Sequence, residues 1–271
     1  MNTTSGNVAQ FTTVDRALDS AWFIDFMDLA NAIPEYADIR ARLAANLAAT
    51  QDSVLLDVGC GTGDDARELA AMLGQGGRVV GTDLSEVMVE EARRRSAGSD
   101  LPVEFQVADV RQLDFPDASF DGVRAKLVLM HCAGIDTAAA ELIRVVRPGG
   151  RITVFDYDFD TTTIDHPDKA ATREVVRCLS DGHPNNWSGR QLRRRFLNLD
   201  LSDVSVTPHT VMLPYSFFRM SVFGKLAAAQ EEGALALSAA ALEDWWKALT
   251  EAEENELFFT SLTGFLLGGT R

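Results

Sequence analysis

The feature that most constrains the fold is a short apolar segment that leads into a glycine-rich loop and then into a helix. Residues Ser53–Gly59 (SVLLDVG) show the continuous apolar pattern of a strand buried on both faces. The loop Asp57–Gly63 (DVGCGTG) follows, and Asp64–Leu73 then places apolar side chains at helical spacing. In an open α/β sheet such a loop lies at the carboxyl edge of the strands, where ligands bind. The segment therefore predicts a ligand site.

The alternation of strand and helix continues beyond this segment. A helix capped by Ser85 and ending near Arg95 is expected, and another over Asp136–Val146 ends at the turn signal Arg147–Gly150 (RPGG). Strands alternating with helices predict a parallel sheet covered on both faces, which is the doubly wound α/β class. The expected further strands are Arg78–Asp83, Val103–Asp109, Phe120–Met130 and Arg151–Asp158.

The remaining segments are expected to complete one domain over residues 1–271, because no repeat or low-complexity linker divides the chain. Helical patterns over residues 15–49, interrupted at Pro34, and over the insert 214–254 are predicted to form a helical cap. Further helices are expected at Asp165–Ser180 and Gly189–Leu197, and further strands at Val204–Leu213 and Glu256–Gly268.

The charge of the chain limits its partners. The formal net charge is −15, so the surface repels phosphate backbones and anionic membranes, and neither a nucleic acid nor a membrane is an expected partner. The first residues lack a signal-peptide pattern and no apolar run is long enough to span a bilayer, so a cytoplasmic protein is expected. The three cysteines, Cys60, Cys132 and Cys178, match no metal-binding spacing, and no metal is expected. The oligomeric state stays open, with a homodimer as one option.

Two ligand classes compete for the glycine loop. A dinucleotide site has the pattern G-x-G-x-x-G, which Gly59 and Gly61 begin, but Asp64 and Asp65 follow where the third glycine should be. Each carboxylate would repel a pyrophosphate by about 1 kcal/mol or more in a partly buried site. S-adenosylmethionine (SAM) has no phosphate and bears a sulfonium and an ammonium, so acids can lie near it. The pattern favours SAM over a nucleotide, and a purely structural turn is the third alternative.

Two carboxylates lie at the ends of the next strands. Asp83 can accept hydrogen bonds from both ribose hydroxyl groups, although it could also cap a helix. Asp109 can accept a hydrogen bond from the adenine amino group, and the Val110 N–H can donate to the ring. Leu84, Met88 and Val110 offer apolar contacts to adenine, while Met88 could equally be part of the core.

In this order and spacing, Asp57–Gly63, Asp83, Asp109 and Arg147–Gly150 resemble the class I SAM-dependent methyltransferases. The branch that is most similar includes the ubiquinone and menaquinone methyltransferases and many natural-product enzymes. The resemblance implies a mostly parallel, seven-stranded Rossmann-like sheet whose last strand is antiparallel, with SAM as the cofactor. It also implies that Gly59 contacts the methionine part, Asp83 the ribose, and Asp109 with Val110 the adenine. The predicted cofactor-binding residues are Asp57, Gly59, Cys60, Gly61, Gly63, Asp83, Leu84, Met88, Asp109 and Val110.

The reaction that follows is methyl transfer from SAM to the oxygen, nitrogen or carbon of a small molecule, as in natural-product biosynthesis. It is an in-line displacement that needs alignment and exclusion of water, and a base only if the acceptor must lose a proton. His131 is expected to close the fourth strand and is the candidate base, although a lone histidine more often has a structural role. A rate controlled by His131 would rise with pH near a pKa of about 6.5, or wherever burial moves it.

Three other functions remain alternatives. A SAM-binding enzyme of this fold could catalyse a different reaction, such as a cyclisation. A nicotinamide-dependent oxidoreductase is disfavoured by Asp64 and Asp65. A SAM-binding regulatory module would not need a helix-rich cap. The acceptor itself is not identified by the sequence, because one scaffold serves many acceptors.

Overall fold

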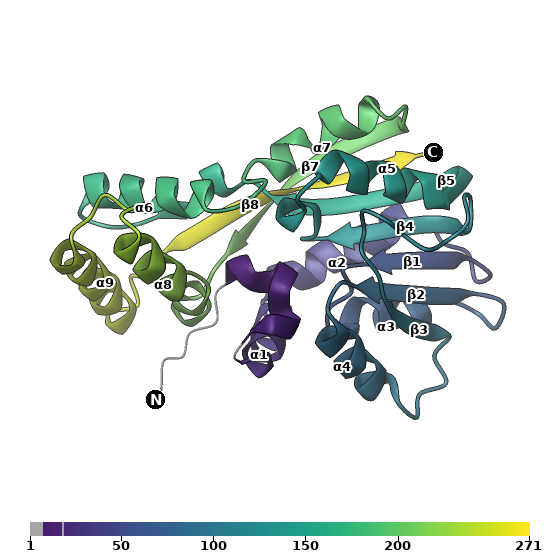
Figure 1. The fold of residues 1–271 in the computed structure, drawn as a ribbon, viewed down its shortest axis with the longest axis horizontal. Coiled ribbons are helices and arrows are strands. Elements are labelled where there is room, and N and C mark those ends of the chain that lie inside the picture. The colour runs from purple at the N-terminus through teal and green to yellow at the C-terminus, as the bar shows by residue number, and fades with distance from the viewer. Residues whose placement is uncertain (1–7, 18) are drawn as a thin grey trace.

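The computed structural model describes residues 8–17 and 19–271, and its centre is a single mixed sheet (Figure 1). The strands follow the order β3-β2-β1-β4-β5-β8-β6, and β7 pairs with β8. Strands β1 to β5 are parallel, while β8 is antiparallel to β5, β6 and β7. The bounds are β1 Val54–Val58, β2 Arg78–Asp83, β3 Val103–Val107, β4 Phe120–Lys126, β5 Val146–Tyr157, β6 Thr163–Ile164, β7 Ser202–Met212 and β8 Thr260–Thr270.

The predicted fold class is confirmed: the sheet is mostly parallel, doubly wound and Rossmann-like. The predicted count of seven strands was wrong, because the described chain forms eight. The additional strand is β6, whose residues Thr163 and Ile164 pair with Ser261 and Thr260 at the start of β8. A strand of two residues has no recognisable period, so its existence depends on the length of β8 rather than on its own sequence.

Helices cover both faces of the sheet. On one face, α3 and α4 pack against β1 to β3, and α2 packs against β5 and β8; on the other face lie α5 and α7. Leu69 of α3 and Val89 of α4 are buried, as is Leu142 of α5, and burial of each such side chain contributes about 1.5–3 kcal/mol. The helices are α1 Ala21–Asn31, α2 Pro34–Asn46, α3 Asp64–Ala71, α4 Glu86–Ser96, α5 Ile135–Val145, α6 Lys169–Asp181, α7 Ser188–Leu197, α8 Tyr215–Glu231 and α9 Ala239–Glu254, with the 3-10 helices η1 Val8–Arg16, η2 Leu129–His131 and η3 Phe159–Thr161.

Three helices gather beyond the start of β8, away from β1 to β3 (Figure 1). Helices α6, α8 and α9 bury a core of their own around Val175, Leu226, Trp245 and Trp246. The N-terminal segment lies between this group and the sheet, since η1 contacts α8, α4 and η2. This group includes α6, which lies outside the predicted cap ranges, whereas α2 of the range 15–49 packs on the sheet. The predicted cap of residues 15–49 and 214–254 and the single domain over residues 1–271 both stay predictions. Within the described ranges, we find no helix with the length and apolarity that crossing a membrane requires.

Two boundaries differ from the predicted ones, at the carboxyl end of β4 and at the amino end of β5. The predicted strand Phe120–Met130 ends at Lys126, because Leu127 takes a left-handed backbone conformation with φ of +60°. Leu129–His131 then forms η2, so His131 lies on a short helix rather than on a strand. The predicted turn at Arg147–Gly150 is instead part of β5, which begins at Val146.

Candidate active site

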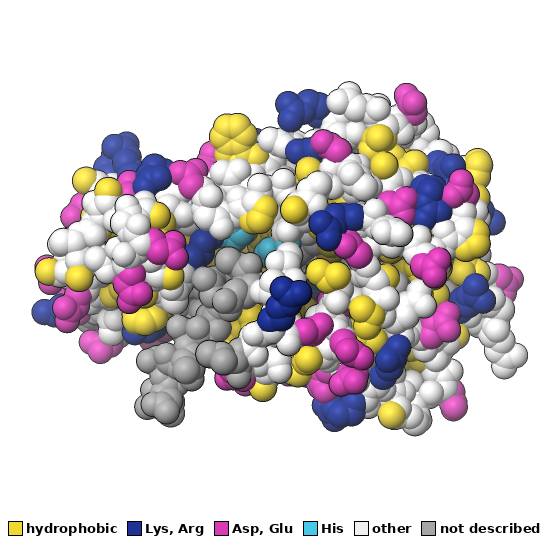
Figure 2. Space-filling view, in the orientation of Figure 1, with side chains coloured by type: hydrophobic (Ala, Val, Ile, Leu, Met, Phe, Trp, Pro, Cys, Tyr) yellow, Lys and Arg dark blue, Asp and Glu magenta, His cyan; other side chains and the backbone are white. Residues whose placement is uncertain are grey.

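A cavity of about 540 Å³ lies along the carboxyl edge of the sheet, between the glycine loop and the cap. We name its two parts by the residues that line them. The glycine-loop end is lined by Val58–Gly61, Asp83, Leu84, Met88 and Ala108–Arg111. The cap end is lined by Tyr36, Tyr157, Phe159, His183, Leu213, Phe217, Phe218, Lys225 and Leu262. Figure 2 shows histidine surface at the centre of this face, between the part formed by α6, α8 and α9 and the part formed by the sheet.

The glycine loop presents its backbone to the cavity. Gly59 and Gly61 have φ angles of +65° and +52°, which residues other than glycine rarely adopt. A Cβ on Gly59 would lie 2.3 Å from Val128, and one on Gly61 would lie 2.9 Å from Met27. The Cys60 N–H donates to the Thr82 carbonyl at 2.9 Å, which fixes the loop against β2. The loop is therefore held open to a close-fitting ligand by glycine at these two positions.

Asp83 ends β2 and lines the cavity. Its two carboxylate oxygens accept backbone N–H groups, one from Gly61 at 2.9 Å and one from Ser85 at 2.9 Å. Burial raises the pKa of Asp83 against the effect of these hydrogen bonds. Ser85 caps α4 by accepting the Met88 N–H at 3.2 Å, so Asp83 is not needed as the helix cap. Each Asp83 oxygen retains a lone pair that could accept a hydrogen bond from a hydroxyl group.

The next carboxylate lies two residues after β3, which ends at Val107 and not at the predicted Asp109. Asp109 accepts from the Arg111 guanidinium at 3.0 and 2.6 Å, and this pair lowers the pKa of Asp109. Val110 lines the cavity beside it, while Leu84 is 44% exposed and Met88 is almost completely buried. Arg111 was not among the predicted residues, because a surface arginine has no distinctive pattern in sequence. The structure thus brings Asp109, Val110, Leu84 and Met88 to one cavity wall.

Two predicted cofactor-binding residues do not reach the cavity. Asp57 points beneath the loop, where its Oδ2 lies 2.8 Å from the Arg124 guanidinium, and both side chains are almost completely buried. Gly63 begins α3 with a φ of +78°, and a Cβ there would lie 2.7 Å from Phe105. Neither residue lines the cavity, so the predicted contact of Asp57 and Gly63 with a cofactor is not supported. They shape the loop instead.

The two acids after the glycine loop line the cavity, but both are ion-paired. Asp65 lies 2.7 Å from Lys126, 3.4 Å from Arg124 and 3.6 Å from Arg40. Burial alone would raise the pKa of Asp65, but Lys126 and Arg124 outweigh it and hold the pKa at about 2. These cations offset the negative charge, so the repulsion of a pyrophosphate is smaller than the sequence suggests.

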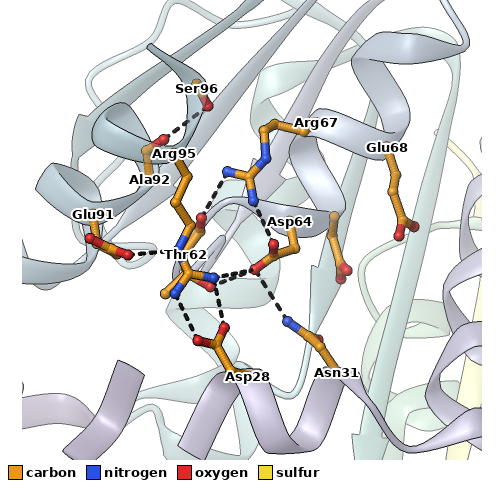
Figure 3. Close-up of polar contacts among 12 residues, drawn as sticks. Asp28, Asn31, Thr62, Asp64, Arg67, Glu68, Glu91, Ala92, Arg95 and Ser96 are labelled. Atoms are coloured by element: carbon orange, nitrogen blue, oxygen red, sulfur yellow. Dashed lines mark hydrogen bonds and ion pairs between the residues drawn. The ribbon is translucent and has the colours of Figure 1, made fainter. Parts of the chain in front are cut away.

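Asp64 joins a second network that connects α1 to the glycine loop (Figure 3). Its carboxylate accepts from Arg67 at 2.5 Å and from the Asn31 amide at 3.2 Å. Arg95 of α4 donates to Asp28 of α1 at 2.6 and 2.9 Å. Asp28 and Asn31 extend from the same helix toward these partners (Figure 3). The network therefore holds α1, which carries the cavity-lining Met27, over the loop.

His131 lies where the two ends of the cavity meet. Its ring centroid is 5.8 Å from that of Phe11 in η1 and 6.4 Å from that of His183. Burial, with a smaller effect of Lys225, lowers the pKa of His131 to about 4. The ring is therefore neutral at pH 7, and the His131 pKa is about 4 rather than the ordinary value near 6.5.

The cap end contains a buried lysine that sequence reasoning missed. The Lys225 ammonium donates to the Leu179 carbonyl and lies within hydrogen-bond distance of the His183 Nδ1, at 2.8 Å in both cases. Burial lowers the pKa of Lys225 to about 7. The hydroxyl groups of Tyr36 and Tyr157 lie 2.5 Å apart on the same part of the wall. The only signal in the sequence is a lysine within the otherwise apolar surroundings of Val222–Ala229.

Comparison with known proteins identifies the part of the chain that builds the glycine-loop end. Residues 55–150 match a family model described as a methyltransferase domain. This part of the chain is therefore similar to methyltransferase domains. The predicted resemblance is thereby confirmed, including its branch: demethylmenaquinone methyltransferase from Symbiobacterium thermophilum is 43% identical over 100 residues, covering 36% of this chain and 39% of that protein.

Solved structures show how far the fold of this chain is shared. YcgJ from Bacillus subtilis has a TM-score of 0.61 and 19% identity, covering 86% of this chain and 97% of that chain. The [4+2]-cyclase SpnF has a TM-score of 0.54 and 22% identity, covering 86% and 80%. The chain spans roughly half of the length of the curated relatives that it matches, at 55%, 39% and 48% for three of them. The fold is thus shared with a protein that is named as a cyclase.

Proposed function

We propose that this protein transfers a methyl group from SAM to a small-molecule acceptor. The observation that carries the proposal is the meeting of the glycine loop, Asp83 and Asp109 on one wall of one cavity. The domain match covers the strands and helices that build this wall, and the demethylmenaquinone methyltransferases among its relatives act on small molecules as their names state.

The lining residues fit SAM in their chemistry. Asp83 offers one free lone pair on each oxygen to a ribose diol, and the glycine loop lets backbone approach the methionine part. Asp109 and Val110 flank the place proposed for adenine, with Leu84 and Met88 as apolar contacts. The sulfonium supplies an electrophilic methyl group, and the protein has to align the acceptor with it and exclude water.

We also propose that His131 contacts the acceptor and accepts its proton where one must leave. Its ring is neutral above its pKa of about 4, and in the described chain it forms no hydrogen bond that would occupy its nitrogens. The turn that carries His131 is fixed by contacts of its backbone: the His131 N–H donates to the Val128 carbonyl at 3.0 Å, and the Asn185 amide donates to the Leu129 and Cys132 carbonyls at 2.9 and 2.6 Å. The base would therefore be held on a fixed turn at the junction of the two cavity ends.

The test begins with the cofactor. Isothermal calorimetry with SAM, its demethylated product S-adenosylhomocysteine and NAD should show binding of the first two and none of NAD. Tight binding of NAD without SAM would contradict the proposal. The solved cyclase of the same fold makes a second assay necessary, in which methyl-labelled SAM and candidate acceptors are incubated with the enzyme. Label in the acceptor supports methyl transfer, whereas conversion of a substrate without label would indicate a cyclisation.

A further inference from the structure

Three basic side chains from three separate segments line the cap end of the cavity and its junction with the glycine-loop end. His131 is on η2, His183 lies between α6 and α7, and Lys225 is on α8. Lys225 is 6% exposed, and its ammonium has one carbonyl and one imidazole nitrogen within 2.8 Å. An ammonium has three donors, so in the described residues one donor of Lys225 has no hydrogen-bond partner. Since Lys225 lines the cavity, that donor is available to a ligand.

No carboxylate balances these bases among residues 8–17 and 19–271. Lys225 forms no ion pair there, and the carboxylates that line the cavity, Asp64, Asp65, Asp83 and Asp109, belong to the sheet side. A buried charge without a counter-ion is costly. Burial is the largest cause of the low pKa of all three bases, and the charge of Lys225 lowers the pKa of both histidines further.

The surroundings of the bases are apolar and largely aromatic. The His183 ring stacks on Phe159 with centroids 3.5 Å apart and an angle of 13° between the planes. Phe217 and Phe218 of α8 and Leu262 of β8 line the same part of the cavity. A flat apolar molecule fits such a wall, and an anionic oxygen on it would supply the missing counter-charge.

We propose that the acceptor is a flat apolar molecule with an ionised oxygen, a phenolate, enolate or carboxylate, and that the Lys225 ammonium binds this oxygen. The inference rests on the proposed methyl transfer and specifies its substrate class. Lys225 is the binding residue, and His183 with the Leu179 carbonyl positions its ammonium. A charge-assisted hydrogen bond in a water-poor site is about twice as strong as a neutral one, which would give the site its selectivity.

The test uses small probes and protein saturated with S-adenosylhomocysteine. 2-Naphthoate is compared with the uncharged 2-naphthalenemethanol, and both are titrated by calorimetry near pH 6.5. We expect naphthoate to bind at least about tenfold more tightly than the alcohol, and Lys225→Met to remove this preference while S-adenosylhomocysteine affinity stays within about twofold. Lys247→Met, on the exposed face of α9, is the matched control and should keep the preference.

A spectroscopic arm separates phenols from carboxylic acids. 4-Nitrophenol absorbs at longer wavelength when ionised, so its spectrum reports the phenolate directly. We expect the wild type to lower the pKa of the bound phenol and Lys225→Met to leave it at the solution value. If Lys225 increases the affinity for nitrophenol more than the affinity for naphthoate, the acceptor is phenolic or enolic. The reverse result assigns a carboxylate.

The pH dependence provides an independent readout. Naphthoate affinity should fall as pH rises through the Lys225 pKa, which is about 7 in the free protein, because the amine loses its charge. The groups that face Lys225 do not titrate in this range: the pKa of Cys178 is raised by burial, and those of His131 and His183 are lowered. Naphthoate affinity of Lys225→Met should not fall in this pH range. Lys225→Arg, which keeps the charge, should still prefer naphthoate to the alcohol above pH 8.

Equal affinity for naphthoate and the alcohol in the wild type would overturn the inference, as would an unchanged preference in Lys225→Met. If Lys225→Met does not fold, Lys225→Gln replaces it with the same expected result. S-adenosylhomocysteine binding is measured separately. If the wild type does not bind S-adenosylhomocysteine, the result counts against the proposed function. A missing anion preference with normal cofactor binding counts only against the role of Lys225.

Discussion

The two ends of the cavity differ in charge and in how they are assembled. At the glycine-loop end, backbone amides and the carboxylates of Asp83 and Asp109 lie at or just after the ends of consecutive strands. At the cap end and at its junction with the glycine-loop end, His131, His183 and Lys225 come from segments that lie far apart in the chain. The first end suits a cationic cofactor with a ribose, and the second suits an anion on an apolar body. A difference of this kind separates a cofactor site shared by a family from an acceptor site particular to one chain.

The largest effect is expected at the junction of the two ends. If His131 accepts the acceptor proton, His131→Ala should lower kcat about 10²- to 10⁴-fold and leave SAM affinity nearly unchanged. The ring is the active base only when it is neutral, so kcat should rise with pH through the His131 pKa of about 4. Between about pH 6 and 9 the wild type and the variant should therefore have parallel pH profiles.

His209→Ala is the matched control for this measurement. His209 lies on β7, outside the cavity lining, and forms a hydrogen bond with Thr207 at 3.0 Å. Its kcat should match that of the wild type. A kcat of His131→Ala within about fivefold of wild type would show that positioning alone carries the reaction, and that the junction has no base.

The second prediction tests the glycine-loop end by itself. Asp83→Ala should weaken SAM binding by about 2–4 kcal/mol, which is roughly 30- to 1000-fold, because two ribose hydroxyl groups lose a charged acceptor. Naphthoate binding at the cap end should not change. Asp117→Ala, an exposed carboxylate paired with Arg144, controls for general charge effects in the same calorimetric titration. A change in SAM affinity below threefold in the folded variant would leave Asp83 with a structural role.

The third prediction concerns the effect of the buried Lys225 on the free energy of unfolding. The Lys225 pKa falls from 10.5 to about 7 on folding, so the charged form is disfavoured in the native state. Lys225→Met should then raise the free energy of unfolding at pH 7 by about 1–3 kcal/mol, although it abolishes anion binding. The unfolded chain binds more protons than the native one between about pH 7 and 10.5, so wild-type stability should rise with pH in that window.

Urea unfolding at several pH values measures both effects. The rise in stability with pH should be absent or smaller in Lys225→Met, which cannot titrate. A variant that is less stable than the wild type at pH 7 would mean that Lys225 is a structural donor to Leu179 rather than an unbalanced charge. That outcome would also weaken the contrast between the two ends.

The same contrast decides how much the sequence could predict. The carboxyl ends of parallel strands meet at one edge of the sheet, so the cavity wall with Gly59, Asp83 and Asp109 could be predicted from the pattern of strands and helices. The ion pair of Asp57 could not be predicted, because its buried partner, Arg124, lies 67 residues away on β4. Lys225 was missed because burial of one lysine depends on how α6 and α8 pack, which no local period encodes.

The smallest effect is expected where the N-terminal segment closes on the glycine-loop end. Asp15 of η1 accepts hydrogen bonds from the Ser85 hydroxyl and from the Glu86 and Val87 N–H groups at the start of α4. Loss of a side chain that accepts the free N–H groups at a helix start typically costs about 1 kcal/mol in total, so Asp15→Ala should destabilise the protein by about that amount.

Because η1 also contributes Phe11 and Val14 to the cavity wall, looser attachment of η1 should weaken SAM binding as well. A loss of 1 kcal/mol corresponds to about fivefold, so we expect a decrease of about two- to fivefold in SAM affinity for Asp15→Ala. The effect should disappear on acidification of the wild type: the Asp15 pKa is lowered, so its contribution is present above the usual value of 3.8 and is lost as pH falls through the lowered one. Asp19→Ala, which removes a carboxylate just beyond η1, is the control. If Asp15→Ala binds SAM as tightly as the wild type does, η1 closes only the cap end, and the cofactor site is complete without it.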